Sequence, residues 1–223
     1  MIDILRNIHI ITGLVLLLLG ALQIILPKYG LRHRNIGTAY FLTMFIVTIS
    51  SMIIALYRIF IEENSGLWFL FDVSLFSLYM CSSGFLLARV KNRRSLQGIN
   101  YLPIAGMLIG SGLMILAFNF LLKGEMSAAM IAFVFGSIQT MFSLFDFQYF
   151  VREKRSKKHG EQTWKALHIG RMIGSYIAAV TAYLVNAVTI GPIWVKWLGP
   201  TIIGTALIIY FTNKLLPHKH PIQ

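Results

Sequence analysis

Charged residues are scarce in this sequence. Asp, Glu, Lys and Arg make up 13% of its 223 residues, whereas soluble globular domains carry about 25%. Cysteine is scarcer still, because Cys81 stands alone and excludes an intrachain disulfide. The composition therefore excludes an ordinary water-soluble domain and a disulfide-stabilised one.

Several catalytic and cofactor motifs are also missing. The chain has no phosphate-binding loop, no dinucleotide-binding glycine motif, no Gly-x-Ser-x-Gly and no His-Glu-x-x-His. These absences argue against a nucleotide cofactor and against a hydrolase or transferase, and keep oxidoreductase as the one enzymatic class. Without Cys-x-x-Cys-His, covalently attached haem is excluded as well.

Long apolar segments are what the sequence has in abundance. Hydrophobic residues make up 57% of the chain, and a bilayer core takes about 20 apolar residues per helix. The runs are continuous, which favours helices over a membrane β-barrel. We therefore expect an all-α integral membrane bundle, one domain over 1–223, with seven transmembrane helices at about 4–27, 36–60, 67–88, 101–122, 127–150, 166–190 and 197–215.

The basic residues predict the orientation of this bundle. Following the chain through seven crossings places 16 of the 20 Lys and Arg residues on one face. The positive-inside rule makes that face cytoplasmic, with the N-terminus outside and the C-terminus inside. We expect a multi-pass protein of the cell inner membrane, with anionic lipids as partners at the cytoplasmic face. The net charge of +12 is then a topology signal, and nucleic acid is not expected as a partner.

Polar residues at helical spacing mark the interior of the bundle. His9 and Gln23 share a face of the first segment. Gln139 and Asp146 share one on the fifth, and a third face on the sixth carries His168, Arg171, Ser175 and Asn186. Ionisable groups at such depth cost about 2.5–3.5 kcal/mol each on insertion scales, so they should find partners.

Asp146 and Arg171 are the leading predicted pair. Each lies about one turn from the cytoplasmic end of its helix, and a short loop makes these two helices neighbours. The pair is either a structural contact or part of a gate or proton relay. Arg34, on the second segment, lies at similar depth and competes as a partner of Asp146.

Asp72 predicts a second polar cluster near the outer face. It is close in depth to His9, Arg58 and Asn186. Pairing with Arg58, protonation of the carboxyl group, and a proton-binding pair with His9 are the three readings that we keep.

His33 and His168 could share a cofactor, since they lie toward the same face of the bundle. Two such histidines suit the axial positions of haem b. His33 is placed in the loop 28–35 at headgroup level, so ordinary interfacial histidines are the alternative. No cofactor is assigned from the sequence beyond this haem b hypothesis.

Small residues predict close helix contacts. Gly170, Gly174 and Ala178 form one ridge, and Gly106 and Gly110 form another. Such ridges let helix backbones approach, and they are compatible with a homo-oligomer or a larger membrane complex.

Two segments carry a family resemblance. "HIITGLVLLLLGALQIILPKYGLRHRNIGTAY" at 9–40 and "HIGRMIGSYIAAVTAYLVNA" at 168–187 resemble the front and rear motifs of a domain-of-unknown-function family of multi-pass bacterial membrane proteins. Asp146 matches an Asp of that family near the inner end of the preceding span. The resemblance implies no activity, but it selects positions to test: His9, Gln23, His33, Arg34, Gly37, Tyr40, Asp146, His168, Arg171 and Asn186.

Three functions follow as hypotheses. The first is a transporter of protons, ions or small solutes that uses the buried Asp, Arg and His pairs, with Gln139, Gln23 and Tyr40 along the pathway. The second is a membrane redox protein with haem b or quinone near His33 and His168. The third is an accessory or sensor subunit whose polar residues only hold helices together.

Overall fold

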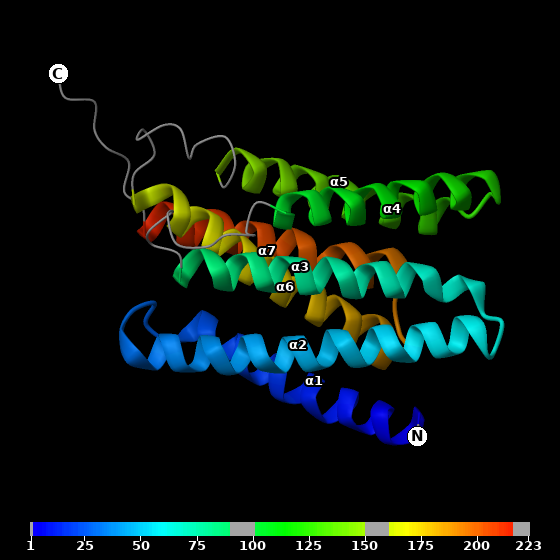
Figure 1. Cartoon of the computed structure of the whole chain (residues 1–223), viewed down its shortest axis with the longest axis horizontal. Coiled ribbons are helices and arrows are strands. Elements are labelled where there is room, and N and C mark those ends of the chain that lie inside the picture. The colour runs from blue at the N-terminus through cyan, green and yellow to red at the C-terminus, as the bar shows by residue number, and fades with distance from the viewer. Residues whose placement is uncertain (1, 90–100, 150–160, 216–223) are drawn as a thin grey trace.

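All regular structure in the described residues is helical. The computed structural model describes residues 2–89, 101–149 and 161–215. Within these ranges a 3-10 turn (Ser65–Leu67) precedes the third of seven α-helices, which are α1 (Ile2–Ile25), α2 (Gly30–Phe60), α3 (Trp68–Arg89), α4 (Leu102–Leu122), α5 (Met126–Phe147), α6 (Glu161–Ala187) and α7 (Ile193–Leu215). The all-α prediction is confirmed. The helices lie side by side along the long axis, and α1 begins at the opposite end from where α7 finishes (Figure 1).

The helices are those of a multi-pass membrane protein. Six of the seven described helices are long and apolar enough to cross a bilayer. The exception is α6, which is 27 residues long but carries His168, Arg171 and Asn186. These polar residues lower the mean hydropathy of the helix, whereas its length matches that of its neighbours.

The start of α2 differs from the prediction. The helix begins at Gly30 and not near residue 36, so His33 and Arg34 lie in its first turns and not in a loop. Gly30 has φ +82°, a left-handed conformation that glycine adopts without steric cost, and the chain therefore reverses within a few residues. Lys28 closes the end of α1, because its Nζ donates hydrogen bonds to the carbonyl oxygens of residues 23, 24 and 26.

The sixth and seventh helices also begin earlier than predicted. They start at Glu161 and Ile193, so parts of the expected loops 151–165 and 191–196 are helical. Residues 90–100, 150–160 and 216–223 lie outside the described residues. Most of the basic residues that predict a cytoplasmic face fall there, so the orientation stays a prediction.

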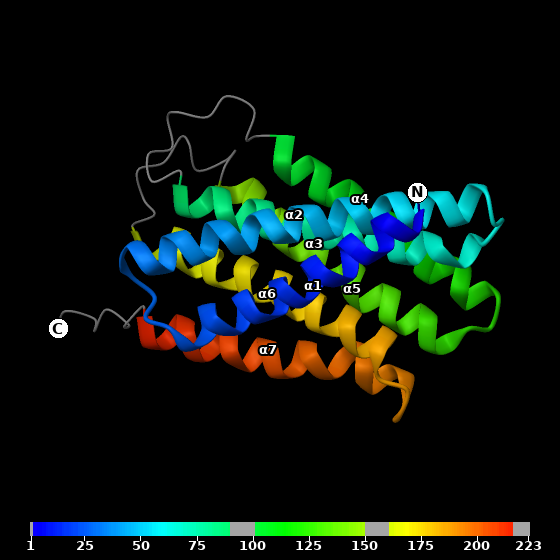
Figure 2. The same cartoon turned by 90° about the horizontal axis from the view of Figure 1, so that it is seen from below.

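The polar helix α6 lies among the other helices. It packs on α3 and α7 and touches α1, and Figure 2 shows it between α3 and α7. Its buried positions, at 170, 171, 174, 175, 178 and 181, follow helical spacing and form one face. Neighbouring helices thus cover the polar face of α6, for which contact with lipid would be least favourable.

The predicted small-residue ridges are close contacts at most of their positions. A Cβ at Gly174 would overlap Met80, and a Cβ at Gly106 would overlap Ser143 and the Tyr79 ring. Gly110 faces Thr140 in the same way, while Ala178 is buried in the core. Gly170 is buried too, but no described atom lies within 4 Å of where its Cβ would stand.

Helices α4 and α5 form a hairpin of their own. They pack most extensively on each other and reach the remaining helices through α3 and α7. Figure 1 shows this pair along one side of the bundle, next to α3 and α7. The interface between the hairpin and the five-helix body positions the charged site described next.

Candidate functional site

Asp146 and Arg171 form a buried ion pair between α5 and α6. Arg171 Nη2 lies 2.6 Å from Asp146 Oδ1, and its Nε donates to Oδ2 at 3.3 Å. The side chains are 0% and 1% exposed. The predicted contact is confirmed, and it links the α4–α5 hairpin to the five-helix body.

Two further groups complete the surroundings of this pair. The Tyr79 hydroxyl of α3 donates to Asp146 Oδ2 at 2.6 Å. Arg171 Nη2 also donates to the Phe142 carbonyl at 2.7 Å, and the guanidinium lies 4.1 Å from the centre of the Phe142 ring. A buried ion pair is stabilising only when such additional hydrogen bonds satisfy both ions, and here they do so for both.

Tyr79 was absent from the predicted site. A tyrosine in an apolar segment is usually counted as core. One signal was present in the sequence, because Tyr79 lies seven residues after Asp72 and therefore on the same face of α3.

Gln139 lies on the same face of α5 as Asp146, as predicted. Its Nε2 donates to the Gly106 carbonyl at 3.2 Å and to Ser143 Oγ at 3.2 Å. Its Oε1 is buried and has no hydrogen-bond partner within residues 2–89, 101–149 and 161–215. An unsatisfied buried acceptor costs about 1–3 kcal/mol, so a bound proton donor would be stabilised there.

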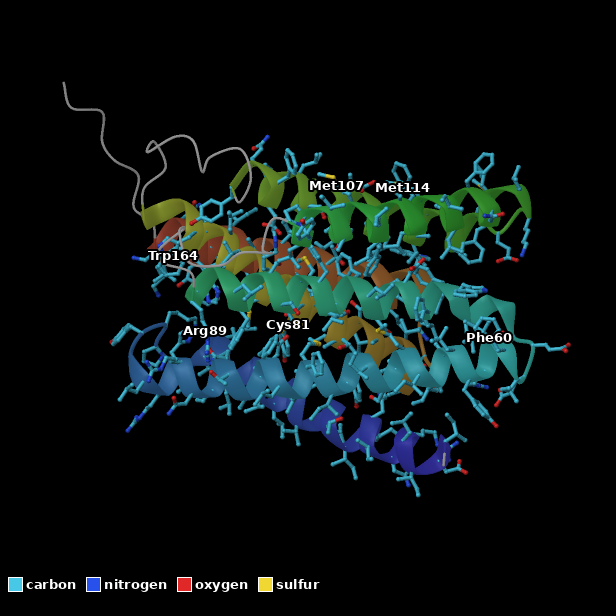
Figure 3. All side chains as sticks on the ribbon, in the orientation of Figure 1. Phe60, Cys81, Arg89, Met107, Met114 and Trp164 are labelled. Atoms are coloured by element: carbon cyan, nitrogen blue, oxygen red, sulfur yellow. The ribbon has the colours of Figure 1, made fainter. Side chains whose placement is uncertain are left out.

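Tyr40 reaches α6 from the other side. Its hydroxyl lies 3.0 Å from Ser175 Oγ, inside a core cluster that includes Cys81 and Tyr176. Figure 3 shows Cys81 on α3 near the middle of the bundle. Arg171 therefore contacts α5 of the hairpin, and Ser175, one turn later on α6, contacts α2 of the five-helix body.

His33 and His168 are brought together at the end where α2 and α6 begin. Their ring centroids are 6.5 Å apart and the ring planes are nearly perpendicular. His168 Nδ1 donates to the Gly84 carbonyl at 2.8 Å, while His33 Nδ1 is buried and has no partner among the residues that the structure describes. Gln23 Nε2 donates to the His33 carbonyl at 2.9 Å and supports its backbone.

The predicted contacts of Asp72 with Arg58 and His9 are wrong, whereas protonation of its carboxyl group stays a prediction. Arg58 pairs with Glu62 on its own helix, because a partner four residues away needs no other helix to reach it. His9 Nδ1 contacts the Val47 carbonyl and Ser50 Oγ, so it does not pair with Asp72.

Asp72 is left half-buried, and its carboxylate faces Gly112 of α4. In the described ranges it has no ion-pair or hydrogen-bond partner.

Asn186 and Arg34 also differ from their predicted places. Asn186 is exposed and donates to the Ala182 carbonyl of its own helix. Arg34 is exposed, and the carboxylate of Asp146 is already occupied by Arg171 and Tyr79. Both predictions used depth alone, whereas the rotation of each helix decides which side chains meet.

Metal binding was tested across the described ranges. No group of three or more His, Cys, Asp or Glu side chains converges there. A site on these residues would have to use two protein ligands, as the His33–His168 pair could supply.

Comparison with known proteins adds no relative. The chain matches no protein-family model, no curated protein and no solved structure. The family resemblance of residues 9–40 and 168–187 therefore stays an expectation.

Proposed function

We propose that this protein is a transporter of protons or small polar solutes in the cell inner membrane. In this proposal all seven helices cross the bilayer, with the N-terminus outside. The α4–α5 hairpin moves against the five-helix body, and the Asp146–Arg171 pair closes the cytoplasmic end of their interface. The observation that carries the proposal is this fully buried ion pair between two helical units.

The division into two units supports movement of one against the other. Alternating access is largely a rigid-body motion of one helical unit relative to another. The hairpin meets the body mainly through α3 and α7, and the ion pair is a polar contact between them at one end. Intramembrane ionisable residues commonly mark substrate pathways or proton relays.

Aromatic side chains close the other end of the same interface. Phe69 of α3 contacts Phe120 of the hairpin and Trp197 of α7, with centroid distances of 6.2 and 5.1 Å. Trp197 also contacts Phe135 of the hairpin at 5.9 Å. The interface thus has a polar closure toward one end and an aromatic closure toward the other, as an occluded transporter requires.

Gln139 lies between these two closures. Its unpaired Oε1 is an acceptor that a proton donor, such as hydronium, water or a small cationic solute, would satisfy. The half-buried Asp72 supplies a carboxylate on the hairpin-facing side of α3. These two groups support a small polar or cationic substrate.

Proton flux into liposomes tests the proposal. The full chain is reconstituted with a trapped pH-sensitive dye, and a potassium diffusion potential drives the protons. We expect flux from the natural protein and its loss in the double variant Asp146→Asn/Arg171→Gln, which is neutral at both positions and keeps hydrogen-bonding side chains. Arg58→Gln is the matched control, because its ion pair is exposed, and should retain flux.

The double variant separates a gate from a purely structural contact. A structural contact predicts that a folded double variant transports normally, and that outcome would overturn the proposal. Normal flux by both Asp146→Asn and Asp72→Asn proteins would overturn it as well.

A further inference from the structure

His33 and His168 face each other across a four-helix arrangement. Helices α1, α2, α3 and α6 pack in a closed order, in which α2 touches α1 and α3, and α6 touches the same two helices. Helices α2 and α6 are therefore diagonal, and both begin at the same end of the bundle (Figure 1). Cofactor sites of helical bundles are built in this way, from side chains on facing helices.

A second contact across the same diagonal fixes the register of the two helices. Tyr40 follows His33 by seven residues, and Ser175 follows His168 by seven. The Tyr40–Ser175 hydrogen bond of 3.0 Å thus lies about 10.5 Å, or two turns, beyond the histidine layer. The histidines are held at equal height, so their rings meet in one layer.

The two rings form an edge-to-face contact, and the distance between their centres is also close to that of two imidazoles on one metal ion. A metal–nitrogen bond of about 2.0 Å and about 1.2 Å from the nitrogen to the ring centre place two opposed rings about 6.4 Å apart. The observed distance is 6.5 Å. Nearly perpendicular ring planes, at 84°, are compatible with opposed ligands because each ring can rotate about its own metal–nitrogen bond.

The hydrogen bonds leave ring nitrogens available for a ligand. Gly84 accepts a hydrogen bond from His168 Nδ1, which leaves Nε2 with a free lone pair. A backbone carbonyl on the second nitrogen is the usual outer partner of a metal-binding histidine. His33 Nδ1, in contrast, is buried with no partner in the described part of the chain, and an unpaired buried nitrogen is costly unless a ligand contacts it.

The number of protein side chains that can bind a metal here indicates which kind of metal group fits between the two histidines. The part of the chain that the structure describes offers no third His, Cys, Asp or Glu to this pair. Haem iron needs only two axial protein ligands, since the porphyrin supplies four nitrogens. The Trp164 ring lies beside this pair, with its centroid 6.5 Å from that of the His168 ring.

The basic side chains at this end of the bundle also favour haem. Arg89 of α3 reaches Thr38 of α2, and Lys165 lies over Trp164; Figure 3 shows Arg89 and Trp164 toward the same end. Burial and then the nearby Lys214 lower the pKa of Lys28 in the α1–α2 loop. Such surroundings repel a bare metal cation and attract the two propionates of haem.

We infer that this protein binds one haem b, with its iron between His33 and His168. The inference concerns binding and is independent of the proposed transport, because the pair is separate from the Asp146–Arg171 contact. Each could stand without the other.

Haemin titration of the detergent-purified full chain tests the inference. We expect a saturable Soret band at one haem per chain and sharp reduced bands typical of low-spin, bis-histidine iron. His33→Ala and His168→Ala should each weaken binding by at least about tenfold, as losses at metal sites do. His9→Ala is the matched control, because His9 bonds to Val47 and Ser50 elsewhere, and should bind as the natural protein does.

Imidazole rescue separates ligation from misfolding. Added imidazole can enter the space left in a His168→Gly protein and restore the low-spin spectrum only if His168 is a ligand. The inference would be overturned by an absence of saturable haem binding, or by haem binding unchanged in both histidine variants. Saturable Zn²⁺ or copper binding at the pair, without haem binding, would also overturn it.

Discussion

Asp146 Oδ1 and Arg171 Nη2 lie 2.6 Å apart in a place where neither side chain meets solvent. Each ion therefore depends on the other, and both depend on Tyr79 and the Phe142 carbonyl for their remaining hydrogen bonds. The first two predictions follow from this dependence.

Removing one member of the pair should destabilise the protein strongly. Arg171→Gln or Asp146→Asn leaves a buried charge without its counter-ion, which costs about 3–5 kcal/mol. The double variant should recover much of that loss, because no charge is left uncompensated. Thermal unfolding in detergent measures all three proteins, and Arg58→Gln should change stability by at most about 1 kcal/mol. Equal losses from single and double variants would contradict the expected coupling.

Tyr79→Phe should destabilise the protein by about 1.5–3 kcal/mol, the usual contribution of a hydrogen bond to a charged group. The substitution removes the donor to Asp146 Oδ2 and keeps the ring that packs near Gly106. The same unfolding measurement applies, with Tyr183→Phe as the control on the exposed side of α6. Equal stability of Tyr79→Phe and the natural protein would show that the hydroxyl contributes nothing.

Gly106→Ala should destabilise by about 1–3 kcal/mol, the usual effect of overpacking a filled core. The added methyl group would overlap Ser143 and the ring of Tyr79, and so would push α4 away from the Asp146 site. Gly13→Ala is the matched control, since no atom lies within 4 Å of its Cβ position and alanine is the better helix former. A comparison of the two unfolding temperatures checks this, and a stable Gly106→Ala protein would contradict it.

Orientation can be tested with cysteine labelling. The natural protein should not react with a membrane-impermeant maleimide, because Cys81 is 1% exposed. Asn64→Cys in the α2–α3 loop and Ile190→Cys in the α6–α7 loop should be labelled from outside intact cells, whereas Tyr29→Cys should be labelled only after the cells are opened. Labelling of Ile190→Cys on the same side as Tyr29→Cys would show that α6 does not cross.

Much of the fold followed from the sequence because apolar length is a local property. Helix number and the approximate bounds need only the run of residues. Asp146 and Arg171 meet through their side chains, although α5 and α6 pack little on each other. The start of α2 was missed because the conformation at Gly30 lets the helix begin before the apolar run does.

Side chains on helices that are distant in sequence were harder to place. Asp72, Asn186 and Arg34 were assigned partners by depth, but their helices are rotated so that these side chains face elsewhere. Tyr79 and Gly84 complete the Asp146 and His168 sites from α3. The spacing from Asp72 placed Tyr79 on a polar face but did not identify its partner, and no pattern marks the Gly84 carbonyl. These contacts depend on which helices become neighbours, which the sequence alone does not state.

The low apolar character of α6 has a consequence for biogenesis. Single helices enter the bilayer from the translocon according to their hydrophobicity, and α6 is the described helix that falls short of the others in this respect. Its buried face packs on α3 and reaches α5 through Arg171, and both of these helices are synthesised before it. In the proposed seven-span arrangement, Arg171 can pair with Asp146 of the preceding helix while α6 enters the membrane. The ion pair would then favour insertion of the least apolar of the described helices as well as its final packing.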